Sequence, residues 1–231
     1  MRALTVAVGF AVFPCSVVHA TTCQVGSLQA YIDLGGAGCS IEDKTVSGFL
    51  DLGVLGGATP ILPADIMVTP LPTPGNPGLS FDFGVTASAG GLLESLFAFS
   101  VAVLPGGMPI EAVGLSLFGS EVAPDGVNTA LLCLGTTDPA CPTPDPILLF
   151  DIGLDSLLTD MRAFPPVATL DLVSDIVVDG GLFGGASLSS ATLRFQEVTV
   201  VPEPTVWLPA TLLALSLIRR RSRPAKKEPA K

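Results

Sequence analysis

Apolar and polar side chains alternate along most of residues 21–200, and this alternation constrains the fold more than any other feature. The clearest stretches are 79–85, 97–103 and 113–117, where every second residue is apolar. A period of two is typical of a half-buried β-strand, because successive side chains of a strand point to opposite faces. Turn sequences rich in Gly and Pro, such as 104–107 and 123–126, separate these stretches.

Six further stretches have strand character: 45–52, 129–134, 147–152, 168–173, 175–178 and 191–200. In the last of these the apolar phase changes at Gln196 and Glu197, which predicts a β-bulge. We therefore expect an all-β fold for residues 21–200, an antiparallel β-sandwich of eight or nine short strands.

Helices play a small part in this expectation. Residues 27–34 have one apolar face and precede two glycines, which predicts a single short helix. The apolar spacing in 154–161 hints at a second helix. The four prolines of 69–78 predict a stiff extended loop.

The charges are segregated along the chain. The region from Thr22 to Pro204 holds twenty acidic and three basic residues, a net charge of −17, whereas seven basic residues fall in the last thirteen positions. An acidic body repels phosphate backbones, so we expect no nucleic-acid partner.

The N-terminus has the pattern of a secretory signal peptide. A basic start at Arg2 precedes the apolar run 3–18, and Val18 and Ala20 place small residues before a cleavage site. We expect residues 1–20 to be a signal helix that the Sec translocon and signal peptidase handle, with cleavage between Ala20 and Thr21. The chain's one histidine, His19, would leave with it.

The C-terminus combines three parts, which are listed in chain order: the motif Val201, Pro202, Glu203, Pro204; the apolar run 205–218; and the basic cluster Arg219, Arg220, Arg221. Fourteen helical residues span about 21 Å, which is short for a bilayer core of about 30 Å. The interfacial ring of Trp207 and the basic cluster nevertheless favour a transmembrane helix that ends on the cytoplasmic side. The acidic body would then lie outside the cytoplasm.

These three parts, in this order, resemble the PEP-CTERM sorting signal of Gram-negative bacteria. The resemblance implies that residues 201–231 are recognised by a membrane protease of the exosortase class. Pro202, Glu203 and Pro204 match the recognition motif, 205–218 the membrane segment and Arg219 to Arg221 the stop. The protein would be anchored transiently in the inner membrane and then delivered to the envelope surface or the extracellular matrix.

Four cysteines remain after removal of the signal, and an even number in an exported chain favours disulfides. Three pairings are possible. The sequence-local solution, which we favour, joins Cys23 to Cys39 and Cys133 to Cys141.

The inventory of side chains argues against an enzyme, because a mature body without histidine lacks the base of the common nucleophilic triads and an imidazole ligand for zinc. Two sets of carboxylates leave a glycosidase as a remote alternative: Asp151, Asp155, Asp160 and Asp171, Asp175, Asp179. We expect each to lie at a strand end or turn, where Asp bonds its own backbone.

Two alternatives concern binding. The body has one tyrosine, and its ten phenylalanines mostly fall in the apolar phase of strands, which weakens specific carbohydrate recognition. Oxygen ligands for calcium are abundant, but no spacing matches a known loop and no other metal or cofactor is expected. We therefore expect a non-enzymatic surface or matrix protein associated with exopolysaccharide or biofilm, and a calcium-dependent or weak carbohydrate-binding adhesion module is the alternative.

Overall fold

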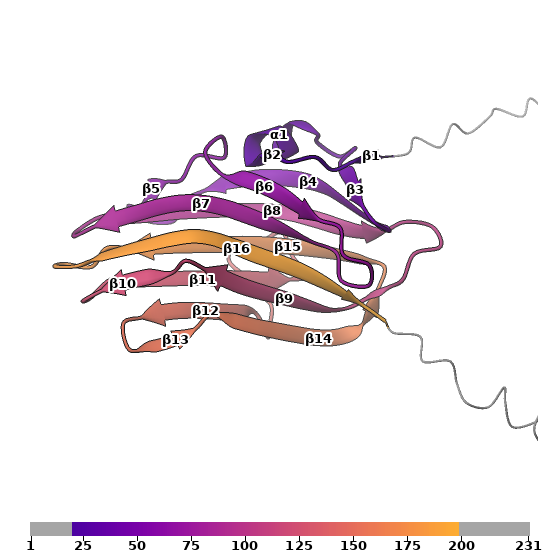
Figure 1. Ribbon diagram of the computed structural model, residues 1–231. Coiled ribbons are helices and arrows are strands. Elements are labelled where there is room, and N and C mark those ends of the chain that lie inside the picture. The colour runs from indigo at the N-terminus through magenta and orange to yellow at the C-terminus, as the bar shows by residue number, and fades with distance from the viewer. Residues whose placement is uncertain (1–19, 199–231) are drawn as a thin grey trace, which may run out of the picture. The chain divides into compact units, whose positions relative to one another are not determined.

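The computed structural model describes residues 20–198, which form two β-sheets packed face to face (Figure 1). The nine-stranded sheet contains β1 (Thr21–Thr22), β3 (Cys39–Ile41), β4 (Lys44–Gly53), β5 (Thr59–Pro60), β8 (Leu92–Val103), β11 (Val127–Leu134), β12 (Ile147–Ile152), β13 (Asp155–Leu157) and β15 (Thr169–Asp179). The seven-stranded sheet contains β2 (Gly26–Ser27), β6 (Met67–Leu71), β7 (Gly78–Ser88), β9 (Ile110–Phe118), β10 (Glu121–Ala123), β14 (Thr159–Val167) and β16 (Gly185–Glu197).

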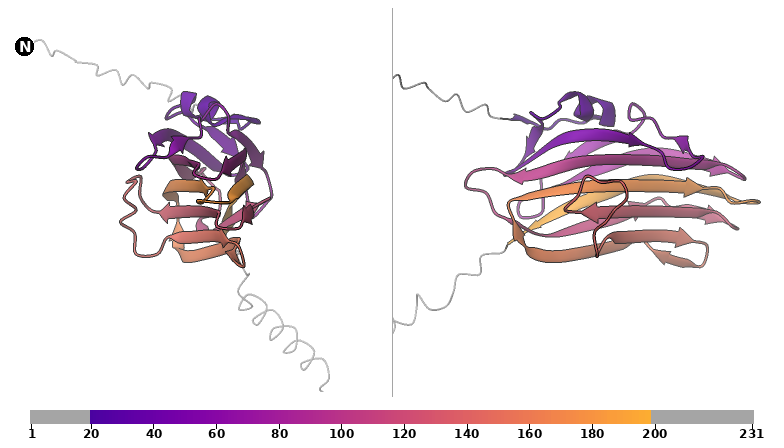
Figure 2. Two further views of the ribbon diagram at one scale, coloured as in Figure 1. Left: turned by 90° about the vertical axis from the view of Figure 1, so that its left-hand side faces the viewer. Right: turned by 180° about the vertical axis from the view of Figure 1, so that it is seen from behind.

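The strand order places segments that are distant in sequence side by side. The nine-stranded sheet runs β1-β3-β4-β8-β15-β11-β12-β13, with β5 beside β8, and the other sheet runs β14-β9-β16-β7-β6-β2, with β10 beside β16. All pairs are antiparallel except β1 with β3 and β5 with β8. The two further views in Figure 2 show both layers. An all-β sandwich of mostly antiparallel strands is therefore confirmed.

An aromatic cluster fills the space between the sheets. Phe99 of β8 is fully buried and stacks on Phe49 of β4, with ring centroids 4.7 Å apart. Phe81 of β7 approaches Phe97 and Phe99 from the opposite sheet, at 4.9 and 6.2 Å. Aromatic pairs at these distances stabilise a fold by more than the burial of their apolar surface alone. The alternation in the sequence therefore predicted that Phe81, Phe97 and Phe99 face the core.

The predicted short helix is present as α1 (Leu28–Asp33). The side chain of Ser27 caps it by accepting a hydrogen bond from the amide of Ala30, at 3.2 Å. Leu28 and Tyr31 are buried, and the Tyr31 ring meets Phe49 edge to face. The helix thus closes one end of the aromatic cluster.

Both disulfides of the sequence-local pairing are present. Cys23 bonds to Cys39 across a loop that contains α1, with Cα atoms 4.8 Å apart. Cys133 bonds to Cys141 at the end of β11, with Cα atoms 5.5 Å apart. Two disulfides indicate an oxidising compartment, extracellular or periplasmic.

Several predicted elements need correction. Residues 20–198 contain sixteen strands rather than eight or nine. Six of them have only two or three residues and carry no visible period, and the longer strands β6 and β14 were also not predicted. The stretches 168–173 and 175–178 form one strand, β15. Residues 154–161 are not helical but form β13 and the start of β14, and Leu154 there is fully exposed. Of the apolar residues with helix-like spacing, Leu158 packs against the core, whereas Leu154, Leu157 and Met161 are exposed.

The proline-rich region forms a loop over only part of its predicted length, and the bulge in β16 lies where it was predicted. Residues 69–71 of the predicted loop belong to β6, and 78 begins β7, so the loop is shorter than expected. The register of β16 against β9 shifts between Gln196 and Glu197, as the change of apolar phase predicted. A second shift, between Leu188 and Ser190, was not predicted.

Candidate functional site

A line of hydroxyl side chains crosses five strands on the outer face of the seven-stranded sheet, and we call it the hydroxyl row. Its members are direct register partners in neighbouring strands: Thr159, Ser116, Thr192, Ser80 and Thr69. At a strand spacing of about 4.8 Å the row is about 19 Å long. The residues before and after each member mostly face the core, so the hydroxyls face solvent.

Hydrogen bonds join parts of this row. Thr159 Oγ1 donates to Ser116 Oγ at 2.7 Å, and Thr192 Oγ1 donates to Ser80 Oγ at 3.4 Å. Ser80 Oγ in turn donates to Asp82 at 3.3 Å. A hydroxyl has one donor and two acceptor positions, so each member retains capacity for an external partner.

Two exposed apolar side chains, Phe118 and Met67, lie along one side of the hydroxyl row. The register places Phe118, Ser190, Asp82 and Met67 in the adjacent line across the sheet. Phe118 is 53 % exposed and Met67 is 46 % exposed. Phe118 is an exception to the expectation that most phenylalanines lie in the core phase, since it is the last residue of β9 and points away from the core. An exposed aromatic ring therefore lies beside a row of hydroxyls.

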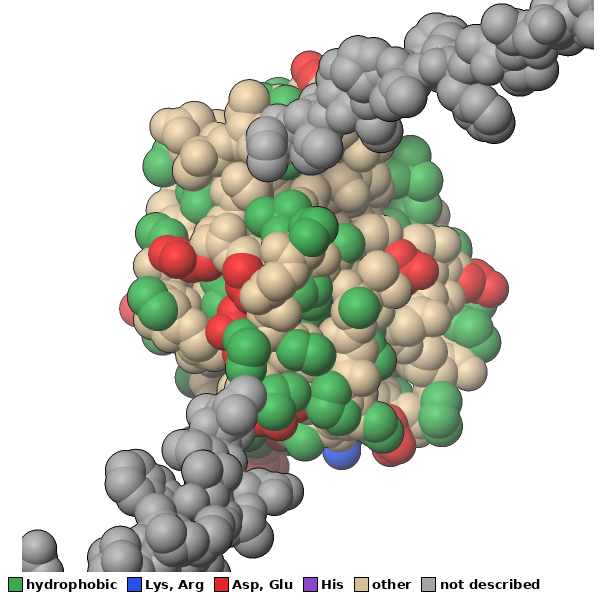
Figure 3. Space-filling view, turned by 90° about the vertical axis from the view of Figure 1, so that its right-hand side faces the viewer, with side chains coloured by type: hydrophobic (Ala, Val, Ile, Leu, Met, Phe, Trp, Pro, Cys, Tyr) green, Lys and Arg blue, Asp and Glu red, His purple; other side chains and the backbone are tan. Residues whose placement is uncertain are grey.

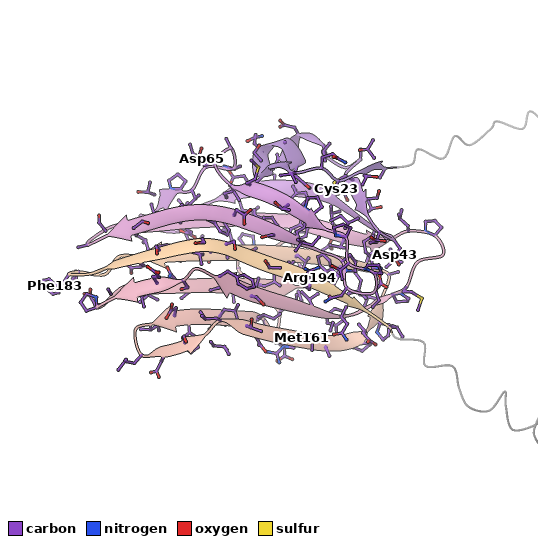
Figure 4. The ribbon with its side chains drawn as sticks, in the orientation of Figure 1. Cys23, Asp43, Asp65, Met161, Phe183 and Arg194 are labelled. Carbon is purple, nitrogen blue, oxygen red and sulfur yellow. A yellow bond between two sulfur atoms is a disulfide. The ribbon has the colours of Figure 1, made fainter. Side chains whose placement is uncertain are left out.

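On the other side of the hydroxyl row, two glycines, which carry no side chain, flank Arg194. Arg194 lies between Gly114 and Gly78 in the register, and Figure 4 labels it together with Met161. A Cβ at Gly78 would lie 2.0 Å from the Leu193 carbonyl oxygen and 2.9 Å from the Arg194 side chain. The guanidinium reaches the neighbouring loop, where it donates to Thr73 Oγ1 at 2.9 Å.

The outer face of the nine-stranded sheet carries one buried carboxylate, Glu94, and one partly buried carboxylate, Asp175. The Glu94 carboxylate accepts the amide of Leu55 at 2.9 and 3.0 Å. Asp175 lies diagonally opposite on β15, and its Oδ1 is buried with no hydrogen-bond partner among residues 20–198. Burial, together with the nearby charge of Glu94, raises the pKa of Asp175 to about 6.

Stability should therefore depend on pH through Asp175. Its pKa is near 4 in the unfolded chain and higher in the fold, so the cost of ionising it is absent below pH 4 and complete above pH 6. We expect Asp175→Asn to stabilise the protein at pH 7 by about 1 kcal/mol, after allowance for solvent screening. The melting temperature of the variant should also change less between pH 5 and pH 7 than that of the wild type.

The matched control is Asp171→Asn, on the same strand but exposed, where it accepts a hydrogen bond from Ser100. We expect it to change stability by less than about 0.5 kcal/mol. Equal melting curves for the two variants at every pH would contradict the assignment to Asp175.

The carboxylates proposed for a glycosidase are arranged differently from the expectation. Asp171 and Asp175 lie inside β15 rather than at a turn, and residues four apart on one strand are about 13 Å apart. That separation exceeds the range of catalytic carboxyl pairs. Asp151 is buried in β12, where it accepts a hydrogen bond from Ser120 Oγ at 2.6 Å, and it therefore supports the fold.

The remaining predicted site residues lie at or beyond the ends of the described region. Ala20 is its first residue, and Thr21 begins β1, paired with Cys39. Val201 to Pro204 and Arg219 to Arg221 lie outside the described residues. Within 20–198, none of the helices has the length and apolarity to cross a membrane, and no three His, Cys, Asp or Glu side chains cluster around a metal position.

Comparisons with known proteins place the chain in no family. No family model and no curated protein matches it. A carbohydrate-binding module solved with β-1,4-galactotriose is 8% identical, over 52% of this chain and 71% of that one, with a TM-score of 0.24. A mannan-recognising carbohydrate-binding module is 9% identical, over 78% and 99%, with a TM-score of 0.30.

A further solved structure is the enzymatically active domain of tailspike protein 4 from bacteriophage CBA120. It is 13% identical, over 66% of this chain and 19% of that one, with a TM-score of 0.26. Similarities at this level assign no function to this chain.

Proposed function

We propose that this protein is an exported β-sandwich that binds neutral polysaccharide on the hydroxyl row. The observation that carries this proposal is the alignment of five solvent-facing hydroxyls beside the exposed ring of Phe118. Sugar hydroxyls both donate and accept hydrogen bonds, and the apolar face of a sugar ring packs on an aromatic ring. The site combines both chemistries on one open face.

The charges of this face favour a neutral ligand. The hydroxyl row and its two neighbouring lines contain one acidic residue, Asp82, and one basic residue, Arg194. The strongly acidic body would repel an anionic polymer that comes close enough for salt not to screen the charges. We propose binding without a catalytic step, in which the polymer lies across the strands.

Affinity electrophoresis against a panel of neutral polysaccharides tests this proposal. We expect wild-type retardation by at least one of them, and we expect Phe118→Ala to weaken binding about tenfold, or roughly 1.4 kcal/mol. Thr192→Val, at the centre of the row, keeps the side-chain shape, removes a donor and an acceptor, and should weaken binding as well.

The matched control is Phe183→Ala, because Phe183 is 84% exposed but lies at the tip of the β15–β16 turn (Figure 4). It should bind like wild type. Equal losses in Phe118→Ala and Phe183→Ala, or no retardation by any polysaccharide, would contradict the proposal.

We further propose that residues 1–20 and 201–231 direct this sandwich to the cell surface or matrix. Signal cleavage after Ala20 would start the mature chain at Thr21, and an exosortase-type protease would process the chain at Pro202 to Pro204. The two disulfides support an oxidising destination. Two prolines around Glu203 disfavour a helix, and a protease needs an extended substrate.

Mass spectrometry of the C-terminus in cells with and without the protease tests this delivery. We expect a shortened C-terminus only when the protease is present, and full length in a Pro202→Ala, Pro204→Ala double variant. Glu228→Ala, in the basic tail, should be processed normally. An identical C-terminal mass in both strains would overturn the proposal.

A further inference from the structure

We propose that, while the precursor is anchored, the end of the sandwich from which β16 leads to the C-terminus lies against the phospholipid surface. We call this end the exit end; it consists of the β6–β7 loop (72–77), the β8–β9 loop (104–109) and the prolines Pro165 and Pro166. The inference rests on the proposed insertion of 205–218 in the membrane.

Hydrogen bonds fix the chain at the exit end up to its last described residue. The amide of Glu197 donates to the Gly75 carbonyl and that of Val198 to the Pro109 carbonyl, each at 3.1 Å. The buried ammonium of Lys44 also bonds Glu197 Oε1 at 2.6 Å. The chain therefore leaves the fold between the two loops, at a defined place.

The β8–β9 loop is held in one shape by Asp43. Asp43 Oδ2 accepts the amide of Met108 at 2.6 Å, and its carbonyl accepts the amide of Leu104 at 2.8 Å. A Cβ at Gly107 would lie 2.5 Å from Asp43 Oδ2, so the loop needs glycine there. This loop presents Leu104, Pro105 and Met108 at the end of the molecule.

Exposed prolines and half-buried apolar side chains lie on the surface of the exit end. Val167 pairs with Ile110, which places the exposed Pro165 and Pro166 next to the β8–β9 loop. Figure 3 views this end and shows hydrophobic side chains gathered beside the point where the chain leaves the described fold.

In the proposed precursor, the length of the connection limits how far this end can lie from the membrane. Six residues, 199–204, separate Val198 from the start of the apolar run, and fully extended they span at most about 21 Å. The strand β16 has 13 residues and is about 43 Å long. If the strands run perpendicular to the membrane plane, the turn at the far end of β16 lies well beyond the roughly 21 Å span of the connection. The exit end is then the part that meets the lipid.

The surface chemistry favours zwitterionic lipid. The exit-end loops contain no Lys or Arg, although the Arg194 guanidinium of β16 donates to Thr73 and Asn76 in the β6–β7 loop. The one lysine nearby, Lys44, is buried and paired with Asp43 and Glu197. Exposed Glu42 precedes Asp43 and would be repelled by anionic headgroups. Contact should therefore be stronger with phosphatidylcholine than with a mixture rich in phosphatidylglycerol.

The test uses the single tryptophan of the chain, Trp207. Full-length protein is reconstituted in phosphatidylcholine vesicles with or without brominated acyl chains, which quench tryptophan at the depth of the lipid. The reporter variants carry Trp207→Phe together with Met108→Trp, with Pro105→Trp, or with Phe183→Trp. We expect both exit-end reporters to lose about half of their emission, because loop side chains reach the interface, and Phe183→Trp to lose none.

The outcomes separate the inference from the proposal on which it rests. Unquenched Trp207 in the wild-type chain would show that 205–218 does not insert, which would refute the anchored precursor itself. Quenched Trp207 with unquenched reporters at both 105 and 108, or with equal quenching at 183, would overturn the proposed orientation alone. Melting curves show which reporter variants are folded, and the two loop positions provide independent readings.

Discussion

Phe99→Ala is expected to lower the free energy of unfolding by about 4 kcal/mol, the largest single loss we expect in this protein. Phe99 is fully buried, stacks on Phe49 and faces Phe81 of the opposite sheet. Its removal leaves a cavity where the two sheets meet, and the rings around it belong to different strands that cannot all move inward. Urea unfolding, followed by circular dichroism, measures the change as a lower midpoint at an unchanged slope.

Phe183→Ala is the matched control, because it removes the same ring from an exposed turn. The change should be within about 0.5 kcal/mol of wild type. Phe99→Leu should fall between the two, since leucine fills part of the space. A loss below about 1 kcal/mol for Phe99→Ala would contradict the central place of this cluster.

Lys44→Met is expected to cost about 3 kcal/mol at neutral pH. The Lys44 ammonium is buried and bonds both Asp43 and Glu197, and methionine keeps most of its stem but not the charge. Burial raises the pKa of Glu197, and the nearby Asp43 raises it further. Burial acts to raise the pKa of Asp43 as well, but the hydrogen bonds from the Lys44 ammonium and the Met108 amide, together with the Lys44 charge, lower it overall. Without the ammonium, these two carboxylates repel each other.

The loss should therefore shrink as the pH falls. Below about pH 4 the carboxylates take up protons and no longer repel, so the melting temperatures of wild type and variant should converge. Arg194→Met is the control, since Arg194 lies on the surface and bonds one loop; its loss should stay below about 1 kcal/mol. A loss for Lys44→Met that is the same at pH 4 and pH 7 would contradict the electrostatic cause.

Local patterns in the sequence determined the longer strands, the capped helix and the bulge in β16. Each depends on side chains a few positions apart: the period of two, Ser27 before an apolar turn, and the phase change at Gln196 and Glu197. The sequence-local disulfides also belong here, because short loops hold their cysteines near one another. For residues 154–161 the apolar spacing predicted a helix, and this prediction was wrong because these residues pair with neighbouring strands.

The tertiary structure alone decided which distant residues share a surface. The hydroxyl row consists of Thr69, Ser80, Ser116, Thr159 and Thr192. Their alignment depends on the strand order and on the register, because a shift of one residue would turn the side chains of a strand to the opposite face of the sheet. Lys44 and Glu197 are 153 positions apart, so nothing in the sequence marks them as partners. The sequence determined which side of most of the longer strands faces the core, since that side follows local periodicity. The candidate binding face and the exit end follow from long-range pairing, which local periodicity does not encode.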